Sequence, residues 1–209
     1  CCGGRKILGE ACAAANADPA AVSRELAACD AGGADAGSPR DDEMGMTELA
    51  DHIVATHHAY LNAALPRIPG LVEKVAGAHG ARHPETIDLR SLFLGFADEL
   101  RQHMAKEEMV LFPMIRDLES TGAAPMHCGG VQNPIGAMLM EHDQAGYALE
   151  RMRELTRGYA PPEDACNTYR VMLHSLEELE RDMHRHVHLE NNILFPKAVA
   201  AQQRAMAGA

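Results

Sequence analysis

The longest stretches of this chain place apolar residues at the three- and four-residue spacing of an amphipathic helix. Each of the four main stretches begins at Thr or Pro, which favour the first positions of a helix. They cover residues 47–65, 84 to about 118, 134–159 and 162 to about 201. A further short helix fits within residues 66–83. Long helices joined in series predict an all-α protein, built as an up-down four-helix bundle.

The N-terminal part has a different character. Short helical patterns cover residues 5–15 and 19–29, and Asp18 before Pro19 is a helix-start signal. Residues 30–45 are rich in Gly, Ala, Asp and Pro, lack apolar periodicity and predict a linker. We therefore expect a small helical module with its linker over residues 1–38, and the bundle over residues 46–205.

One motif occurs twice and is the most informative feature of the sequence. The segments from His103 to Pro113 and from His186 to Pro196 both read HxxxExxxLFP. The offset between these two copies also pairs apolar positions ahead of the motif: Phe93 with Leu176, Phe96 with Leu179, and Leu100 with Met183. The His and Glu of each copy therefore continue an apolar stripe and are predicted to face the core.

The other two long helices are related in the same way, at an offset that is longer by one position. This offset places His142 on His58. The apolar residues around them also match: Met138, Ala145 and Leu149 fall on Val54, Leu61 and Leu65. The bundle is thus predicted to be a duplicated helix pair, with one inward histidine on each first helix and one inward HxxxE on each second. The predicted metal ligands are His58, His103, Glu107, His142, His186 and Glu190.

This residue set has a physical preference for metal. Residues four apart lie on one face of a helix, so each pair presents an imidazole and a carboxylate to a common volume. Ionised glutamates in an apolar core are costly unless they are paired or metal-bound. Imidazole and carboxylate without thiolate favour non-haem iron over structural zinc, which usually closes at four ligands. Six ligands predict two iron ions with glutamates able to bridge, and positions open for an oxo or hydroxo bridge; manganese is the main alternative.

The composition disfavours two classes of partner. The chain has 30 acidic and 19 basic residues and a formal charge of -11, which would repel nucleic acid and an anionic bilayer alike. No apolar run approaches the ~20 residues that span a membrane, and no signal peptide opens the chain. We therefore expect a cytoplasmic protein without nucleic-acid or membrane partners. Six cysteines without CxxC spacing predict reduced thiols.

These motifs resemble the hemerythrin-like superfamily, and more closely the iron-sulfur cluster repair di-iron proteins of the RIC, YtfE or ScdA family. The resemblance covers nearly the whole chain and rests on CCGG at Cys1, the His58 region, HMAKEEMVLFPMI, EHDQAG and HVHLENNILFP. It implies a hemerythrin-like bundle in which the six residues ligate two irons and both glutamates bridge. It also implies a cysteine-containing N-terminal domain, of which residues 1–38 are expected to hold only a part, because in that family the domain begins before CCGG.

Two features depart from related patterns. Oxygen-carrying hemerythrins use five histidines, whereas Gly146 stands one turn after His142, which weakens an oxygen-carrier role. The loop over residues 122–133, with His127 and Cys128, looks longer than in close relatives of the repair family.

Several further residues are candidates for supporting roles. Glu99 and Glu141 are each expected to line the metal cavity or to hold a ligand imidazole, and His57 to be a neighbour of the site. Cys1 and Cys2 are expected to form a functional thiol pair, an expectation that rests mostly on the resemblance. Surface or supporting positions are expected for the other histidines: His52, His79, His83, His127, His174, His184 and His188. Small buried positions are expected for the other cysteines: Cys12, Cys29, Cys128 and Cys166.

The resemblance implies a stress-response protein that restores iron-sulfur clusters damaged by nitric oxide or oxidants, with damaged iron-sulfur proteins as partners. Iron donation and nitric oxide binding or reduction both stay open, so a nitric oxide reductase-like enzymatic activity is undecided. The alternative is a hemerythrin-like protein that binds or senses O2 or nitric oxide. Iron storage is disfavoured because ferritin-like ExxH pairs are missing from the sequence. A homodimer is also left open.

Overall fold

The computed structural model describes residues 7–32, 41–122 and 130–207. Within these ranges the ordered elements are helices, and no strand occurs, which confirms the predicted all-α class. The predicted division between an N-terminal module and a bundle falls near residues 33–40, outside the described residues, and stays a prediction. Cys1, Cys2, His127 and Cys128 also lie outside them.

Two short helices come first, α1 (Leu8–Ala14) and α2 (Pro19–Gly32), and they contact each other. The carboxylate of Asp18 accepts hydrogen bonds from the backbone N–H groups of Ala20 at 3.0 Å and Ala21 at 3.2 Å. Asp18 thus satisfies N–H groups that have no partner within the first turn of α2, as the sequence predicts.

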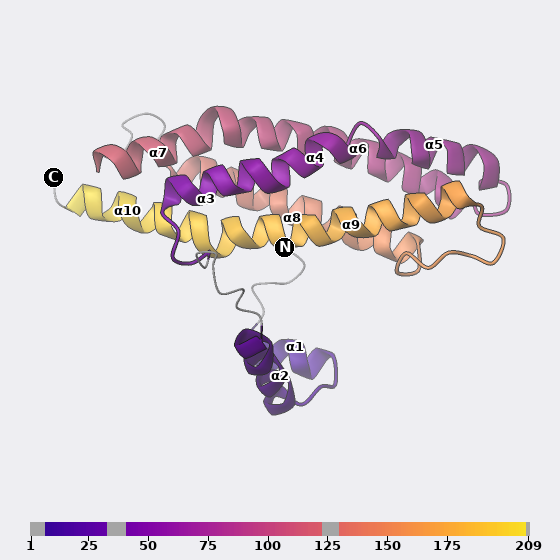
Figure 1. The fold of residues 1–209 in the computed structure, drawn as a ribbon, viewed down its shortest axis with the longest axis horizontal. Coiled ribbons are helices and arrows are strands. Elements are labelled where there is room, and N and C mark those ends of the chain that lie inside the picture. The colour runs from indigo at the N-terminus through magenta and orange to yellow at the C-terminus, as the bar shows by residue number, and fades with distance from the viewer. Residues whose placement is uncertain (1–6, 33–40, 123–129, 208–209) are drawn as a thin grey trace.

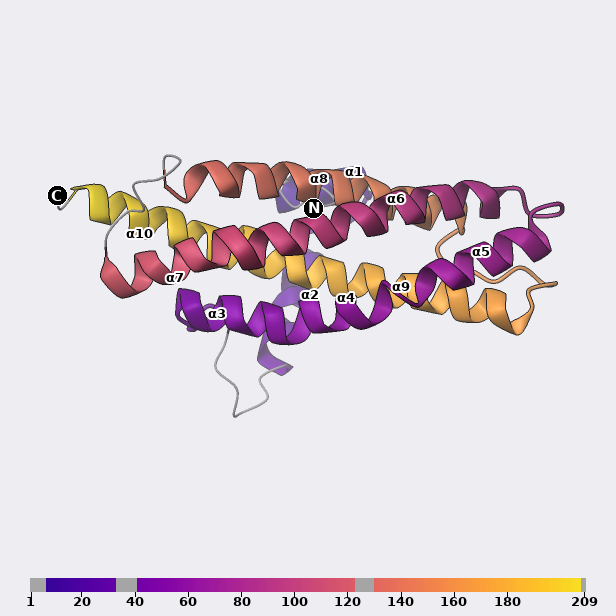
Figure 2. The ribbon, with the colours of Figure 1, turned by 90° about the horizontal axis from the view of Figure 1, so that it is seen from above.

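Four long helical rods run side by side along the bundle (Figures 1 and 2). The first rod contains α3 (Met46–Ile53), η1 (Val54–His58) and α4 (Ala59–Ala64). The second contains α6 (Glu85–Lys106), η2 (Glu107–Leu111) and α7 (Phe112–Thr121). The third is α8 (Gln132–Leu155), and the fourth contains α9 (Asn167–Leu189), η3 (Glu190–Leu194) and α10 (Phe195–Ala207). The predicted extra helix is α5 (Ile68–His79), which packs on α6 and α9.

The connection between α8 and α9 differs from the sequence expectation. The third rod ends at Leu155 instead of residue 159, and the fourth begins at Asn167 instead of residue 162. Three successive residues here adopt left-handed backbone conformations, with φ of 52° at Arg157, 73° at Gly158 and 62° at Tyr159. A left-handed residue ends a right-handed helix, which is why α8 stops early.

The core consists of two apolar clusters. One contains Leu61, Leu100 and Met183, and the other contains Ile53, Leu111 and Leu194. The predicted histidine and glutamate positions of all four rods lie along the sequence between a member of one cluster and a member of the other. All six paired apolar residues ahead of the duplicated motif are buried, as their period predicts. Polar side chains at the junction of the clusters are therefore held inside an otherwise apolar bundle.

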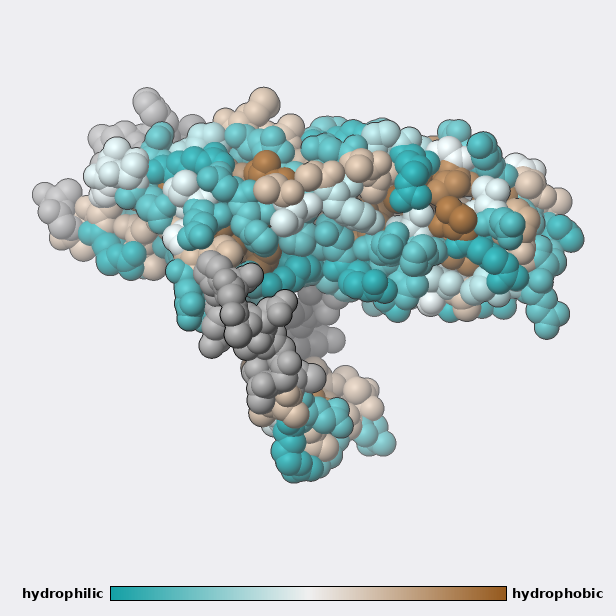
Figure 3. All heavy atoms as spheres, viewed as in Figure 1, coloured by the Kyte–Doolittle hydropathy of each residue, from teal (hydrophilic) through white to brown (hydrophobic). Residues whose placement is uncertain are grey.

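The outside of the bundle is mainly hydrophilic. In the face drawn in Figure 3, hydrophilic side chains dominate and apolar ones form small separate groups. No helix in the described part of the chain is both long and apolar enough to cross a membrane. One cap joins two helices: the Glu119 carboxylate of α7 accepts hydrogen bonds from the first N–H groups of α3, Met46 at 2.7 Å and Thr47 at 2.8 Å.

Candidate metal centre

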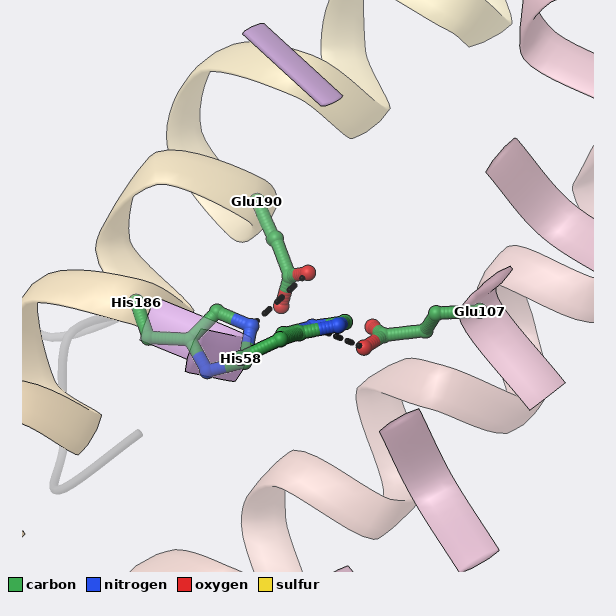
Figure 4. A group of neighbouring side chains, drawn as sticks. All are labelled: His58, Glu107, His186 and Glu190. Atoms are coloured by element: carbon green, nitrogen blue, oxygen red, sulfur yellow. Dashed lines mark hydrogen bonds and ion pairs between the residues drawn. The ribbon is translucent and has the colours of Figure 1, made fainter. Parts of the chain in front are cut away.

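The structure brings the six predicted ligand residues together in the middle of the bundle. Each of the four rods contributes at least one, and none of the six residues is more than 4% exposed. Figure 4 shows four of them, with the carboxylates of Glu107 and Glu190 turned towards the imidazoles of His58 and His186. The site is therefore a set of buried polar groups that ordinary helix packing does not require.

Three π-helical segments lie at this site, a feature that was not predicted from the sequence. His58 ends η1, Glu107 begins η2 and Glu190 begins η3. The proline of each LFP motif has no N–H for the carbonyl four residues earlier, so the turn before it widens. π-helical turns inside α-helices are frequent at functional sites, because the extra residue re-aims the side chains of that turn.

The carboxylate of Glu107 lies between two imidazoles. Its Oε2 atom is 3.3 Å from Nε2 of His58, and its Oε1 atom is 3.2 Å from Nε2 of His103. Glu190 repeats the arrangement, with Oε1 3.2 Å from Nε2 of His186 and Oε2 3.2 Å from Nε2 of His142. Each glutamate thus offers one oxygen to each side of the site.

The donor atoms form two groups that share both glutamates. The His58 group contains His58, His186, Glu107 and Glu190, and the His103 group contains His103, His142, Glu107 and Glu190. Within each group the donor atoms all lie within 4.8 Å of one another. Two cations side by side, each with two imidazoles and shared carboxylates, fit this arrangement.

Unpaired polar atoms provide the test of that fit. Four buried donor atoms have no hydrogen-bond partner within the described residues: Nε2 of His58, both carboxylate oxygens of Glu107, and Oε2 of Glu190. In addition, Nε2 of His103 faces Nε2 of His142 at 3.1 Å. Buried acceptors without donors are costly in an apolar core, and bound cations would satisfy all of them. The residues present therefore fit a pair of metal ions.

In three of the four ligand imidazoles, Nδ1 forms a hydrogen bond with a side-chain oxygen atom. His58 is paired with Glu108 at 2.7 Å, His103 with Glu141 at 2.8 Å, and His142 with the amide oxygen of Asn191 at 2.7 Å. An acceptor on Nδ1 fixes the tautomer that leaves Nε2 free for a metal. Glu141 was expected to have this role. Glu108 and Asn191 were not predicted, although each directly follows a motif glutamate and the two occupy equivalent positions in the duplicated motif.

The fourth ligand imidazole, that of His186, breaks this pattern. His57 occupies the position that the repeat relates to Glu141, and its ring stacks on His186 with centroids 5.4 Å apart. His57 is in turn paired through Nδ1 with Asp182 at 2.8 Å. Nδ1 of His186 is buried and has no hydrogen-bond partner among the described residues. His57 is thus a neighbour of the site, as predicted, and it makes the two halves of the duplicated bundle chemically different.

The phenylalanines of the two LFP motifs pack on the first-helix histidines. The ring of Phe112 stacks on His58 with centroids 5.8 Å apart, and the ring of Phe195 stacks on His142 at 5.9 Å. These contacts restrict the imidazole orientations and keep water away from one face of each ring. The motif therefore supplies both the carboxylate and an apolar support for the histidine of the other helix.

A pocket of about 180 Å³ reaches the site from the side of the His103 group. Its walls contain His103 and His142 but neither His58 nor His186. The remaining lining includes the apolar residues Phe96, Leu100 and Met183 and the polar residues Glu99, Lys106 and Glu141. Glu99 therefore lines the cavity, as predicted, and the His103 group is the side of the site that small molecules can approach.

The electrostatics of the metal-free site show how strongly it favours positive charge. Burial disfavours the charged form of His103, but the adjacent Glu107 carboxylate and the other nearby carboxylate charges raise its pKa to about 9. Burial also disfavours the charged form of Glu190, yet the charge of His186 and the adjacent imidazole of His142 outweigh it and hold the pKa of Glu190 well below its ordinary value. Protons here occupy a site of negative potential that metal cations can occupy instead.

Two expectations for residues outside the site are wrong. His79 was expected at the surface or in a supporting position near the ligands, but it is only 6% exposed and lies at the end of α5. Cys166 was expected to be buried, but it is exposed because it precedes the first turn of α9. Cys12 is buried, as predicted.

The chain is similar to known proteins along nearly its whole length. The family model described as the Hemerythrin HHE cation binding domain matches residues 49–198. The curated iron-sulfur cluster repair protein YtfE of Yersinia pseudotuberculosis serotype IB (strain PB1/+) is 34% identical over 203 residues, which cover 97% of this chain and 87% of that protein. The protein of the same name from Yersinia pestis (strain Pestoides F) matches with the same identity and coverage.

Proposed function

Because this chain belongs to the hemerythrin HHE cation-binding family, and within it to the iron-sulfur cluster repair proteins, we propose that it repairs iron-sulfur clusters damaged by nitrosative or oxidative stress. The working site is a non-haem di-iron centre. Its ligands are His58, His103, Glu107, His142, His186 and Glu190. The observation that carries this proposal is the pair of buried glutamates, each with one oxygen towards an imidazole of each donor group.

The donor set supports iron. Each metal position offers two imidazoles and shared carboxylates without thiolate, which suits a first-row metal with more than four coordination positions. When bound, the irons supply a redox-active pair that can be donated to a damaged cluster or can bind nitric oxide. Gly146, one turn after His142, adds no side-chain donor, so the site does not favour the five-histidine pattern of oxygen carriers.

The chain's own residues make the two metal positions unequal. His103 and His142 line the pocket, and Glu141 holds His103 while also pairing with Lys106 at 2.5 Å. The lysine is half exposed and lowers the net negative charge of the pocket mouth. On the other side, His57 and Asp182 cover His186. The His103 group would therefore hold a metal that can be reached from the pocket, whereas the His58 group would hold one that the pocket does not reach.

Damaged iron-sulfur proteins are the partners that this function requires, and nitric oxide is the small ligand. The experiment compares wild-type protein, loaded with about two irons per chain, with a Glu107→Ala, Glu190→Ala variant. A Glu150→Ala, Glu177→Ala variant, which removes two exposed carboxylates of α8 and α9, is the matched control. We expect wild type and control to reactivate a nitric oxide-treated [4Fe-4S] dehydratase beyond an equal amount of free ferrous iron. No gain over free ferrous iron would overturn the proposal.

A further inference from the structure

A second group of metal-binding side chains lies at the α5 end of the bundle. It contains His79, His83, Asp164 and Cys166, which we call the end cluster. The length of α6 between Glu85 and His103 is about 27 Å at 1.5 Å per residue, so the end cluster is separate from the buried centre. We propose that the end cluster binds one zinc ion through His79, His83 and Asp164, with the thiolate of Cys166 as the fourth ligand.

The backbone places the two histidines one turn apart. His79 is the last residue of α5, and its carbonyl accepts a hydrogen bond from the N–H of His83 at 2.8 Å. The hydroxyl of Thr86 donates to the carbonyl of His83 at 2.7 Å and fixes the start of α6. The two imidazole centroids are 6.2 Å apart. A helix-like turn outside the helix thus gives the HxxxH spacing that suits two imidazoles on one metal.

The loop before α9 supplies the other two donors. Oδ1 of Asp164 is 2.9 Å from Nε2 of His83, and Sγ of Cys166 is 3.2 Å from Nε2 of His79. Donor atoms of His79, His83 and Asp164 all lie within 4.8 Å of one another. Ligand atoms of a tetrahedral zinc site are about 3.4 Å apart, given Zn–N bonds of about 2.1 Å. Small side-chain rotations would therefore bring these three donors to one metal, and Cys166, which contacts His79 but lies outside this group of three, would have to turn further to complete the site.

His83 is oriented in the same way as the imidazoles of the buried centre. Its Nδ1 atom faces the carboxylate of Glu85 at 3.3 Å, which leaves Nε2 to point towards Asp164. A carboxylate behind a histidine is the usual support of a metal-binding imidazole. Arg82 binds the other oxygen of Asp164, at 3.1 Å from Oδ2, so Oδ1 stays available to the cluster.

An ion-pair network alone explains only part of this arrangement. A surface ion-pair network without metal would account for the position of His83 between Glu85 and Asp164. His79 does not, because it is only 6% exposed, its Nδ1 has no hydrogen-bond partner within the described residues, and its Nε2 faces only a thiol. A thiol is a weak hydrogen-bond partner but, as thiolate, a strong zinc ligand. Zinc also accepts the mixture of imidazole, carboxylate and thiolate that these four residues offer.

The consequence is structural, since four protein ligands close a zinc site. The metal would join the turn between α5 and α6 to the loop between α8 and α9. That loop contains the left-handed residues 157–159, and α9 begins at the residue after Cys166. Zinc would therefore link these two connections at the α5 end of the bundle and stabilise the folded chain.

The test uses the full chain with its buried centre already loaded with iron. Zinc is titrated against a chromophoric chelator, and metal analysis counts zinc and iron per chain. We expect one additional zinc of micromolar or tighter affinity, no loss of iron, and a higher melting temperature. His83→Ala and Asp164→Asn, which alter partly exposed residues, should each weaken binding at least tenfold. His174→Ala, which removes an exposed histidine paired with Glu178 one turn away, should change nothing.

Cobalt then tests the thiolate. Cobalt bound at the end cluster should give a near-ultraviolet thiolate charge-transfer band that Cys166→Ser abolishes. No additional zinc, displacement of iron instead, or equal affinity in the His83, Asp164 and His174 variants would each overturn the proposal. Cobalt binding without a charge-transfer band would overturn the assignment of Cys166 as the fourth ligand.

Discussion

The groups behind the imidazoles predict a variant that weakens one metal position and spares the other. Glu141 and Asn191 both hold histidines of the His103 group, whereas Glu108 holds a histidine of the His58 group. Loss of one such partner lowers metal affinity roughly 10- to 100-fold. The two partners act on imidazoles whose Nε2 atoms are 3.1 Å apart and would share one metal, so their effects should overlap instead of adding in full. A Glu141→Ala, Asn191→Ala variant should weaken the pocket-side metal at least as much as either single loss, roughly 10- to 100-fold, or about 1.4–2.8 kcal/mol.

The assay is metal analysis after dialysis against chelators of increasing strength, with circular dichroism to confirm that each variant is folded. Wild-type protein should lose its metals at one chelator strength or at two close ones. The double variant should keep one metal under conditions that remove the other. Glu108→Ala is the converse control, because it should weaken the metal position remote from the pocket. Equal weakening of both positions in both variants would show that the two donor groups do not act as separate sites.

Other predictions concern stability. The raised pKa of His103 adds about 3 kcal/mol to the free energy of unfolding of the metal-free protein. This contribution is fully present below pH 6.5 and is lost as the pH rises towards 9. Urea unfolding between about pH 6 and 9.5 checks it, and a free energy of unfolding that does not change with pH would contradict it. Glu119→Ala removes the carboxylate that caps α3 and should cost roughly 1–2 kcal/mol, whereas an unchanged urea midpoint would show that water replaces the cap. Phe93→Ala opens a cavity at a fully buried position and should cost about 3–5 kcal/mol, with metal content retained; metal loss would mean that the core and the centre are not independent.

Short-range patterns determined much of this protein. Helical period and the duplicated HxxxE motif depend on residues a few positions apart, so the sequence alone indicated the all-α class, the four rods and the six side chains that the structure brings together. The burial of a glutamate within an apolar stripe is visible in the same way, because the stripe is continuous on both sides of it. The nearly constant offset between the two halves then predicted which helices act as pairs.

The tertiary structure decided what surrounds those side chains. Glu108 and Asn191 hold histidines on other helices, and contacts between rods leave no periodic signal in the sequence. The segments η2 and η3 lie just before the prolines of the LFP motifs, whereas η1 has no proline at the equivalent position, so propensity alone does not place these segments. The difference between the two halves also needs three dimensions. His57 and Glu141 occupy related positions in the repeat, yet His57 stacks on the imidazole of His186 and Glu141 lines the pocket.

The end cluster shows most clearly that contacts between distant segments cannot be read from local sequence patterns. His79 ends α5 and Asp164 lies in the loop before α9, and each alone is an ordinary residue of a helix end or a loop. Only the packing of α5 against α9 brings them within 4.8 Å. The early end of α8 and the late start of α9 also come from left-handed residues that the apolar period does not reveal. Local sequence thus specified the rods and their inward residues, whereas the donor groups, their supports and their access were set by contacts between segments far apart in the chain.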